Sequence, residues 1–128
     1  MKVYLDTSAF MKLVFDEPES AALVEELHSR SSGRRMSSIL LETESRRAAL
    51  RAGVPQADVT TALSGVNLAD APRSLFSEAG LLPGATLRSL DALHLATALH
   101  HGADVLISYD ERLLSAAIDH GLVTSSPA

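Results

Sequence analysis

Four acidic side chains in this 128-residue sequence could together carry metal chemistry, and they come from four separated segments: Asp6, Glu44, Asp91 and Asp110. Asp6 directly follows the apolar run "VYL", with no cationic residue beside it. A carboxylate at the edge of a core is costly unless it is paired. Clustered carboxylates cannot all stay ionised without a cation, and such oxygen ligands suit Mg²⁺ or Mn²⁺. The types of these residues therefore indicate a divalent-metal site.

Alternating strands and helices must bring these acids together. We predict strands at 2–6, 36–38, 66–69, 104–108 and, briefly, 122–124. We predict helices at 8–15, 19–30, 40–52, 55–64, 73–81, 88–101 and 111–120. This alternation is typical of an α/β fold whose central parallel sheet is covered on both faces. Ligand sites in such sheets lie beyond the carboxyl ends of the strands, where Asp6 and Asp110 would be neighbours.

Asp91 is the only acid in the helix predicted at 88–101. On a helical wheel it shares a mainly apolar stripe with Leu95 and Ala98, and His94 lies at the margin of that stripe. A structural role is an equal alternative, because an acid in the first turn of a helix is favoured by the helix dipole. The position of Asp91 alone does not decide between these interpretations.

The helix at 40–52 offers two glutamates, Glu42 and Glu44. The wheel places Glu44 with Leu41 and Ala48, on a face apolar enough to pack on the sheet, and Glu42 nearly opposite. We therefore expect Glu44 to reach the site and Glu42 to be a solvated surface acid. A salt bridge from Glu44 to Arg47 is the structural alternative. The choice between the two glutamates stays open at this point.

Asp6 and Asp110 also have structural explanations, because each precedes a predicted helix and Asp is a favoured N-cap. Capping and metal binding do not exclude each other. The convergence of all four acids on one sheet edge favours the functional interpretation. Two ions about 3.5–4 Å apart there would activate a water and stabilise the leaving oxygen in phosphodiester hydrolysis.

The composition limits the class of protein. We expect one domain over residues 1–128, long enough for a core. The sequence has no cysteine, so it forms neither disulfides nor thiolate zinc sites. We see no signal peptide or membrane span and expect a cytoplasmic protein. The net charge of −5 argues against coating nucleic acid by bulk electrostatics, while the 46% hydrophobic content leaves apolar surface for a partner or for self-association.

Several rival functions fail on particular residues. Lysine occurs only at positions 2 and 12. A haloacid-dehalogenase-type phosphatase would need a downstream lysine and an Asp where Ser8 stands, and a receiver domain would need the same lysine. A zinc site at His94, His100 and His101 lacks an HExxH motif and cysteines. We expect His94 to be a packing residue near the core.

Four segments carry a resemblance to a known family: "VYLDTSAF", "SSILLETESRRAALR", "SLDALHLATAL" and "ADVLISYDERL". They resemble PIN-domain ribonucleases, above all the VapC-type toxins of bacterial toxin–antitoxin pairs. The resemblance covers nearly the whole chain, in order. It implies a three-layer α/β/α sandwich and metal-dependent cleavage of RNA.

The resemblance also assigns roles to the acids. Asp6 and Asp91 would be the principal Mg²⁺ ligands, with Mn²⁺ as an alternative metal. Glu44 would complete this site or hold the attacking water. Asp110 would bind a second ion, if one is bound. Whether one or two metal ions bind stays open at this point.

Other residues take supporting roles by the same resemblance. Ser108, two residues before the last Asp, would lie near the site, and Thr7 would orient Asp6 or a metal-bound water. Arg47 and Arg51 could contact flanking phosphates of the RNA, against the alternative that they are solvated or salt-bridged.

The resemblance further implies partners. We expect an RNA substrate, a cognate antitoxin and a homodimer. The alternative from another functional class is a PIN-like binding or assembly module with little or no nuclease activity. The RNA target and the identity of the antitoxin cannot be predicted from the sequence.

Overall fold

The computed structural model describes residues 1–30 and 32–128; Ser31, in the polar connection at 28–35, lies outside the described residues. Five strands form one sheet in the order β3-β2-β1-β4-β5, and every neighbouring pair is parallel. Their bounds are β1 Lys2–Leu5, β2 Arg34–Ser38, β3 Asn67–Ala69, β4 Val105–Ile107 and β5 Thr124–Ser125. The predicted parallel sheet is confirmed.

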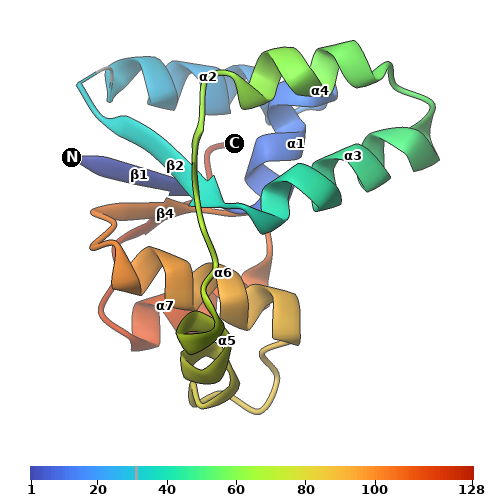
Figure 1. Cartoon of the computed structure of the whole chain (residues 1–128). Coiled ribbons are helices and arrows are strands. Elements are labelled where there is room, and N and C mark those ends of the chain that lie inside the picture. Colours follow the sequence, from blue (N-terminus) through green and yellow to red (C-terminus); the bar gives the residue numbers. More distant parts are fainter. Residues whose placement is uncertain (31) are drawn as a thin grey trace.

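Helices cover both faces of this sheet, which gives the expected three layers (Figure 1). On one face lie α1 (Thr7–Val14), α2 (Ser20–Ser29), α3 (Leu40–Ala52) and α4 (Gln56–Leu63). On the other lie α5 (Arg73–Gly80), α6 (Ser89–His100) and α7 (Glu111–Asp119). None of the helices in the described part of the chain is both long and apolar enough to cross a membrane.

The central strands alternate their side chains between two hydrophobic cores. Val3 and Leu5 of β1 pack into the core beneath α1–α4, whereas Tyr4 packs into the core beneath α6 and α7. In β4, Ile107 packs into the first of these cores and Leu106 into the second. This period of two explains why both strands are apolar throughout.

Strand β2 begins at Arg34, two residues before the predicted start. Arg34 pairs with Lys2, and the Arg34 amide donates to the Met1 carbonyl at 2.8 Å. Backbone pairing therefore extends the strand over charged residues whose side chains reach solvent. The apolar pattern alone could not show this extension.

The buried side of α3 differs from the one we predicted. Its buried residues are Leu41, Ser45 and Ala49, and this stripe lies between Glu42 and Glu44 on the helix surface. The wheel argument for Glu44 is therefore wrong, because both glutamates flank the face that packs on the core. The predicted end of the helix is confirmed, since Gly53 adopts φ 71°, a conformation that favours glycine.

Helix α6 has no exposed face over most of its length. All seven residues from 92 to 98 are buried, because α6 packs against β2, α5 and α7. The apolar stripe predicted around Asp91 is therefore part of a helix that is buried on all sides. Asp91 lies at its first turn, where the helix approaches the surface.

Candidate active site

Asp6 lies at the switch point of the sheet, where the chain continues from β1 to β2 on one side and returns to β4 on the other. It caps α1, and its carboxylate accepts from the Ala9 amide at 2.9 Å. It also accepts from the hydroxyls of Ser8, at 2.8 and 2.9 Å, and Ser108, at 2.7 Å. Asp6 is only 3% exposed. Burial raises the pKa of Asp6 above its usual range, because removing the carboxylate from water costs more than its hydrogen bonds recover.

Two serines join the ends of the central strands. Ser8 accepts from the Tyr109 amide at 2.9 Å, and Ser108 accepts from the Asp110 amide at 3.0 Å, while both donate to Asp6. Ser108, expected near the site, lies within hydrogen-bond distance of Asp6. Ser8 was not predicted as a site residue. The available signal was its place two residues after a helix-capping Asp, within reach of that carboxylate.

Asp91 and Asp110 approach the same edge from two helices. Asp110 caps α7 and accepts from the amides of Arg112 and Leu113 at 2.9 and 3.4 Å, so its predicted capping role is confirmed. The pKa of Asp91 is raised, first by burial and then by the negative charges of Asp110 and Asp6. Asp91 is therefore close enough to Asp6 and Asp110 for their charges to disfavour its ionised form.

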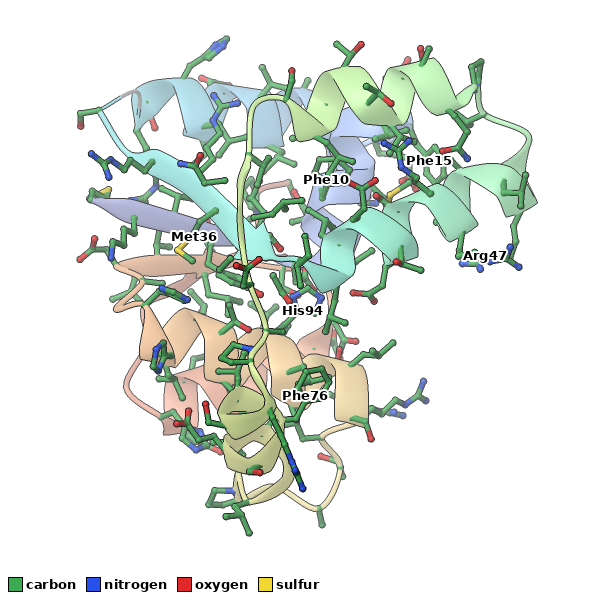
Figure 2. The ribbon with its side chains drawn as sticks, in the orientation of Figure 1. Phe10, Phe15, Met36, Arg47, Phe76 and His94 are labelled. Atoms are coloured by element: carbon green, nitrogen blue, oxygen red, sulfur yellow. The ribbon has the colours of Figure 1, made fainter. Side chains whose placement is uncertain are left out.

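Glu44 is hydrogen-bonded to His94 and not to the other three acids. Its Oε1 lies 2.8 Å from His94 Nε2, and the alternative salt bridge to Arg47 does not form. His94 Nδ1 lies 2.7 Å from the Tyr4 hydroxyl. Figure 2 shows His94 between α6 and the start of α3, while Arg47 points outward from α3. His94 is buried as predicted, but it also connects the core to Glu44.

Of the two roles expected for Thr7, to orient Asp6 or a metal-bound water, the first is not supported by a hydrogen bond to Asp6. Its hydroxyl lies 3.2 Å from His94 Nε2, while the neighbouring Ser8 hydroxyl contacts Asp6. The reason is helical geometry, since side chains of consecutive residues point about 100° apart. The two hydroxyls of the "DTS" segment therefore contact different residues: Thr7 contacts His94 and Ser8 contacts Asp6.

A cleft of about 470 Å³ opens at this edge, and it is lined by basic, acidic and hydroxyl side chains: Ser8, Arg88, Tyr109, Asp110, Glu111 and Arg112. Arg88 and Arg112 were not predicted as site residues. Arg47 and Arg51, which were predicted to contact RNA, are exposed on α3 and do not line this cleft. A larger cavity, about 590 Å³, lies between α1 and α2 and contains none of the four acids.

The donor set of this edge suits a hard divalent cation. Asp6 is a buried carboxylate without a cationic partner in the described part of the chain, and Asp91 is destabilised as an anion by two other carboxylates. The expected ready-made cluster is nevertheless not formed. Across residues 1–30 and 32–128, no three His, Asp or Glu side chains are arranged to hold a metal ion. Mg²⁺ needs only one or two protein carboxylates, since it keeps several waters.

A sequence model of the PIN domain matches residues 3–119. The chain belongs to the PIN-domain family. Ribonuclease VapC46 of Mycobacterium tuberculosis is 39% identical to this PIN domain over 129 residues, which cover 98% of each chain. Ribonuclease VapC35 of the same species is 38% identical over 131 residues, which cover 98% of this chain and 96% of the relative. The chain is therefore a VapC-type PIN domain.

Solved structures agree with this fold. One solved structure is VapBC2 from Rickettsia felis, bound to a DNA fragment from its promoter. The match covers 100% of this chain and 100% of the matched chain, with a TM-score of 0.79 and 14% identity. VapC20 of Mycobacterium tuberculosis, described as a toxin that cleaves the sarcin–ricin loop, matches 98% of this PIN domain and 99% of its own chain. That match has a TM-score of 0.76 and 19% identity. At these identities the likeness concerns the fold.

Proposed function

We propose that this PIN domain is a Mg²⁺-dependent endoribonuclease, with Mn²⁺ as an alternative metal, and the toxin of a toxin–antitoxin pair. The observation that carries the proposal is the buried carboxylate of Asp6 at the β1–β4 switch point, which has no ion-pair partner in the described part of the chain. After burial, the charges of Asp110 and Asp6 also raise the pKa of Asp91. Relatives named ribonucleases, at 38–39% identity over nearly the full chain, support the activity. The acidic edge supports its metal dependence.

Each acid has a proposed role in this reaction. Asp6 and Asp91 would hold the metal, Asp110 would hold a second ion if one binds, and Glu44 would orient the attacking water. A divalent cation supplies an activated water and stabilises negative charge on the leaving oxygen. Ser8 and Ser108 would keep the Asp6 carboxylate in one orientation, because they donate to it from two different strand ends.

The reaction itself is hydrolysis of an RNA phosphodiester. The water oxygen forms a bond to phosphorus, and the bond from phosphorus to the leaving ribose oxygen breaks. The proton released by the water ends on the leaving group or in solvent. Neutral protein donors cannot balance the charge of the phosphate beside three carboxylates, so a cation is needed at this edge.

Two pairs of arginines are candidates for binding RNA phosphates. Arg88 and Arg112 line the cleft that contains Ser8 and Asp110. Burial and the charges of Asp110 and Asp6 raise the pKa of Asp91, and Arg88 is one of the groups that oppose this rise. We therefore favour Arg88 and Arg112 for the phosphates nearest the scissile bond. Arg47 and Arg51, on α3, remain candidates for phosphates farther along the RNA.

Proposed partners are a cognate antitoxin and a second copy of the chain. The solved VapBC2 assembly supports an antitoxin partner. Exposed apolar side chains on α5, at its end and on α6 support a homodimer: Phe76 is 47% exposed, Leu81 84% and Leu90 48%. A Phe76→Glu variant should be monomeric by light scattering, whereas a dimer unaffected by this charge would place the interface elsewhere.

The proposed activity is tested with the purified chain, free of antitoxin, on a panel of structured RNAs. We expect cleavage with MgCl₂, none with EDTA, and none by Asp91→Asn. Glu42→Gln is the matched control and should cleave normally, because Glu42 is ion-paired with Arg46 outside the site. A folded, Mg²⁺-binding preparation that cleaves nothing would favour the binding-module alternative.

A further inference from the structure

A hydrogen-bonded chain of three side chains joins the core of the sheet to the proposed active site. The Tyr4 hydroxyl lies 2.7 Å from His94 Nδ1, and His94 Nε2 lies 2.8 Å from Glu44 Oε1. Tyr4 is fully buried and His94 is 2% exposed. Glu44 is thus tied through His94 to the central strand, although it belongs to a helix on the opposite face of the sheet.

The chemistry of the partners assigns the donor and acceptor roles of a neutral imidazole at His94. A carboxylate only accepts hydrogen bonds, so His94 donates from Nε2 to Glu44. A neutral imidazole protonated on Nε2 has a lone pair on Nδ1, which accepts from the Tyr4 hydroxyl. The two rings also meet edge to face, with centroids 5.8 Å apart and an angle of 77°. Both contacts limit rotation of the imidazole.

The same chain distinguishes the two glutamates of α3. Both flank the buried stripe, so helix geometry does not choose between them. Glu42 forms an ion pair with Arg46 on its own helix. Within the described part of the chain, the side chain hydrogen-bonded to Glu44 is His94. The partner of each glutamate, not its place on the helix, separates the surface acid from the site acid.

We propose that His94, held by Tyr4, is a positioning residue that fixes the Glu44 carboxylate in the active site. This inference rests on the proposed function, because it gives Glu44 its place beside the attacking water. His94 acts through Glu44 and does not touch the RNA. Tyr4 acts one step further back, by holding one tautomer and one orientation of the ring.

The first experiment needs neither RNA nor metal. In the ¹⁵N-labelled protein, the His94 ring should show a protonated Nε2 and an unprotonated Nδ1 that accepts a hydrogen bond. Tyr4→Phe removes the hydroxyl and keeps the ring, so we expect the Nδ1 signal to shift and the two tautomers to mix. Unchanged His94 signals in Tyr4→Phe would overturn the proposal.

The second experiment measures whether Tyr4 and His94 act through Glu44. Tyr4→Phe should lower kcat by about tenfold with KM for RNA unchanged, as outer-shell substitutions at metal sites do. In a Glu44→Gln background the same substitution should cause no further loss. An equal loss in both backgrounds would overturn the proposal. His94→Gln places an amide donor near the position of Nε2 and should retain more activity than His94→Leu.

Two control variants distinguish a general loss of stability from a loss of Glu44 positioning. Ser45→Ala removes a buried hydroxyl that donates to the Leu41 carbonyl of the same helix, so it lowers stability without touching Glu44. Glu42→Gln removes the other glutamate of α3. Both should leave kcat within about twofold of the wild-type value. If no RNA is cleaved at all, the proposed function fails, while the His94 spectra still decide this inference.

Discussion

Asp6 opposes the stability of the fold that contains it. Burial raises its pKa, so the folded chain binds this proton more tightly than the unfolded chain does. The contribution of Asp6 to stability is therefore greatest below the ordinary pKa of an aspartate, about 3.9, and falls as pH rises through the higher folded value. At neutral pH the ionised carboxylate remains a cost, which a bound cation would relieve.

Asp6→Asn should raise stability and abolish activity together. The amide oxygen can still accept from the Ala9 amide, and the buried charge is gone. We expect an increase in Tm at pH 7.5 of at least about 3 °C, the response to roughly 1 kcal/mol in a domain of this size. Calorimetry of the metal-free protein measures it. A lower Tm for the variant would show that hydrogen bonds to the carboxylate outweigh its desolvation.

The raised pKa values of Asp6 and Asp91 also predict how pH affects metal binding. Protons compete with Mg²⁺ for these carboxylates at a higher pH than they would for ordinary ones. Binding of Mg²⁺ at 10 mM MgCl₂ stabilises the fold by about 2.7 kcal/mol if this concentration is 100 times Kd, and the resulting rise in Tm should shrink as pH falls from 8 toward 5. Asp91→Asn should reduce it at every pH. A pH-independent effect would contradict the assignment.

At the scale of elements, the strands and helices with regular patterns were predictable. Helix α3 was predicted over the range observed, because Gly53 ends it. The faces of the helices were less predictable. The wheel cannot show that α5 and α7 cover α6 on its remaining sides, nor that the α3 stripe centres on Ser45.

The site residues at the ends of strands could be predicted from the sequence, whereas the side-chain contacts between different elements could not. Asp6 and Asp110 could be placed together because parallel strands share a carboxyl edge. The contacts of Ser8 and His94 depend on three elements meeting, and Arg88 lies in a loop whose path no pattern shows. For Glu44 the helical-wheel argument was wrong, and no pattern could show its contact with His94.

Two buried serines, one in β2 and one directly after β4, should respond differently to substitution. Ser108, following β4, donates to Asp6 and accepts from the Asp110 amide, whereas the Ser37 hydroxyl of β2 has no hydrogen-bond partner within the part of the chain that the structure describes. Ser108→Ala should cost about 1–3 kcal/mol in unfolding free energy and reduce cleavage. Ser37→Ala should change stability by less than about 0.5 kcal/mol. Equal losses in chemical denaturation would contradict the proposed bridge.

At the scale of the whole molecule, the net charge of −5 means that RNA cannot be held by overall attraction. Binding must depend on local cations close to the acidic edge, and Arg88 and Arg112 line its cleft. Loss of these two charges should therefore matter more than loss of two charges elsewhere on the surface.

The double variant Arg88→Gln/Arg112→Gln should weaken RNA binding and reduce the slope of log K against log salt by about 1–2, near 0.7 per lost single-strand phosphate contact. Fluorescence anisotropy in EDTA measures this without cleavage. Arg47→Gln/Arg51→Gln carries the same change in net charge and is the matched control. A larger change of slope in the control would move the RNA path to α3.

The proposed function depends most on Asp6 and Asp91 forming a metal-dependent site for RNA hydrolysis. Its most direct test is the single-turnover cleavage rate of one RNA substrate as a function of MgCl₂ concentration, for the wild type, Asp6→Asn and Asp91→Asn. We predict a rate that rises with Mg²⁺ to saturation in the wild type and is at least about 10²-fold lower in both variants at every concentration. Cleavage by either variant within tenfold of the wild-type rate, or wild-type cleavage unaffected by EDTA, would contradict it.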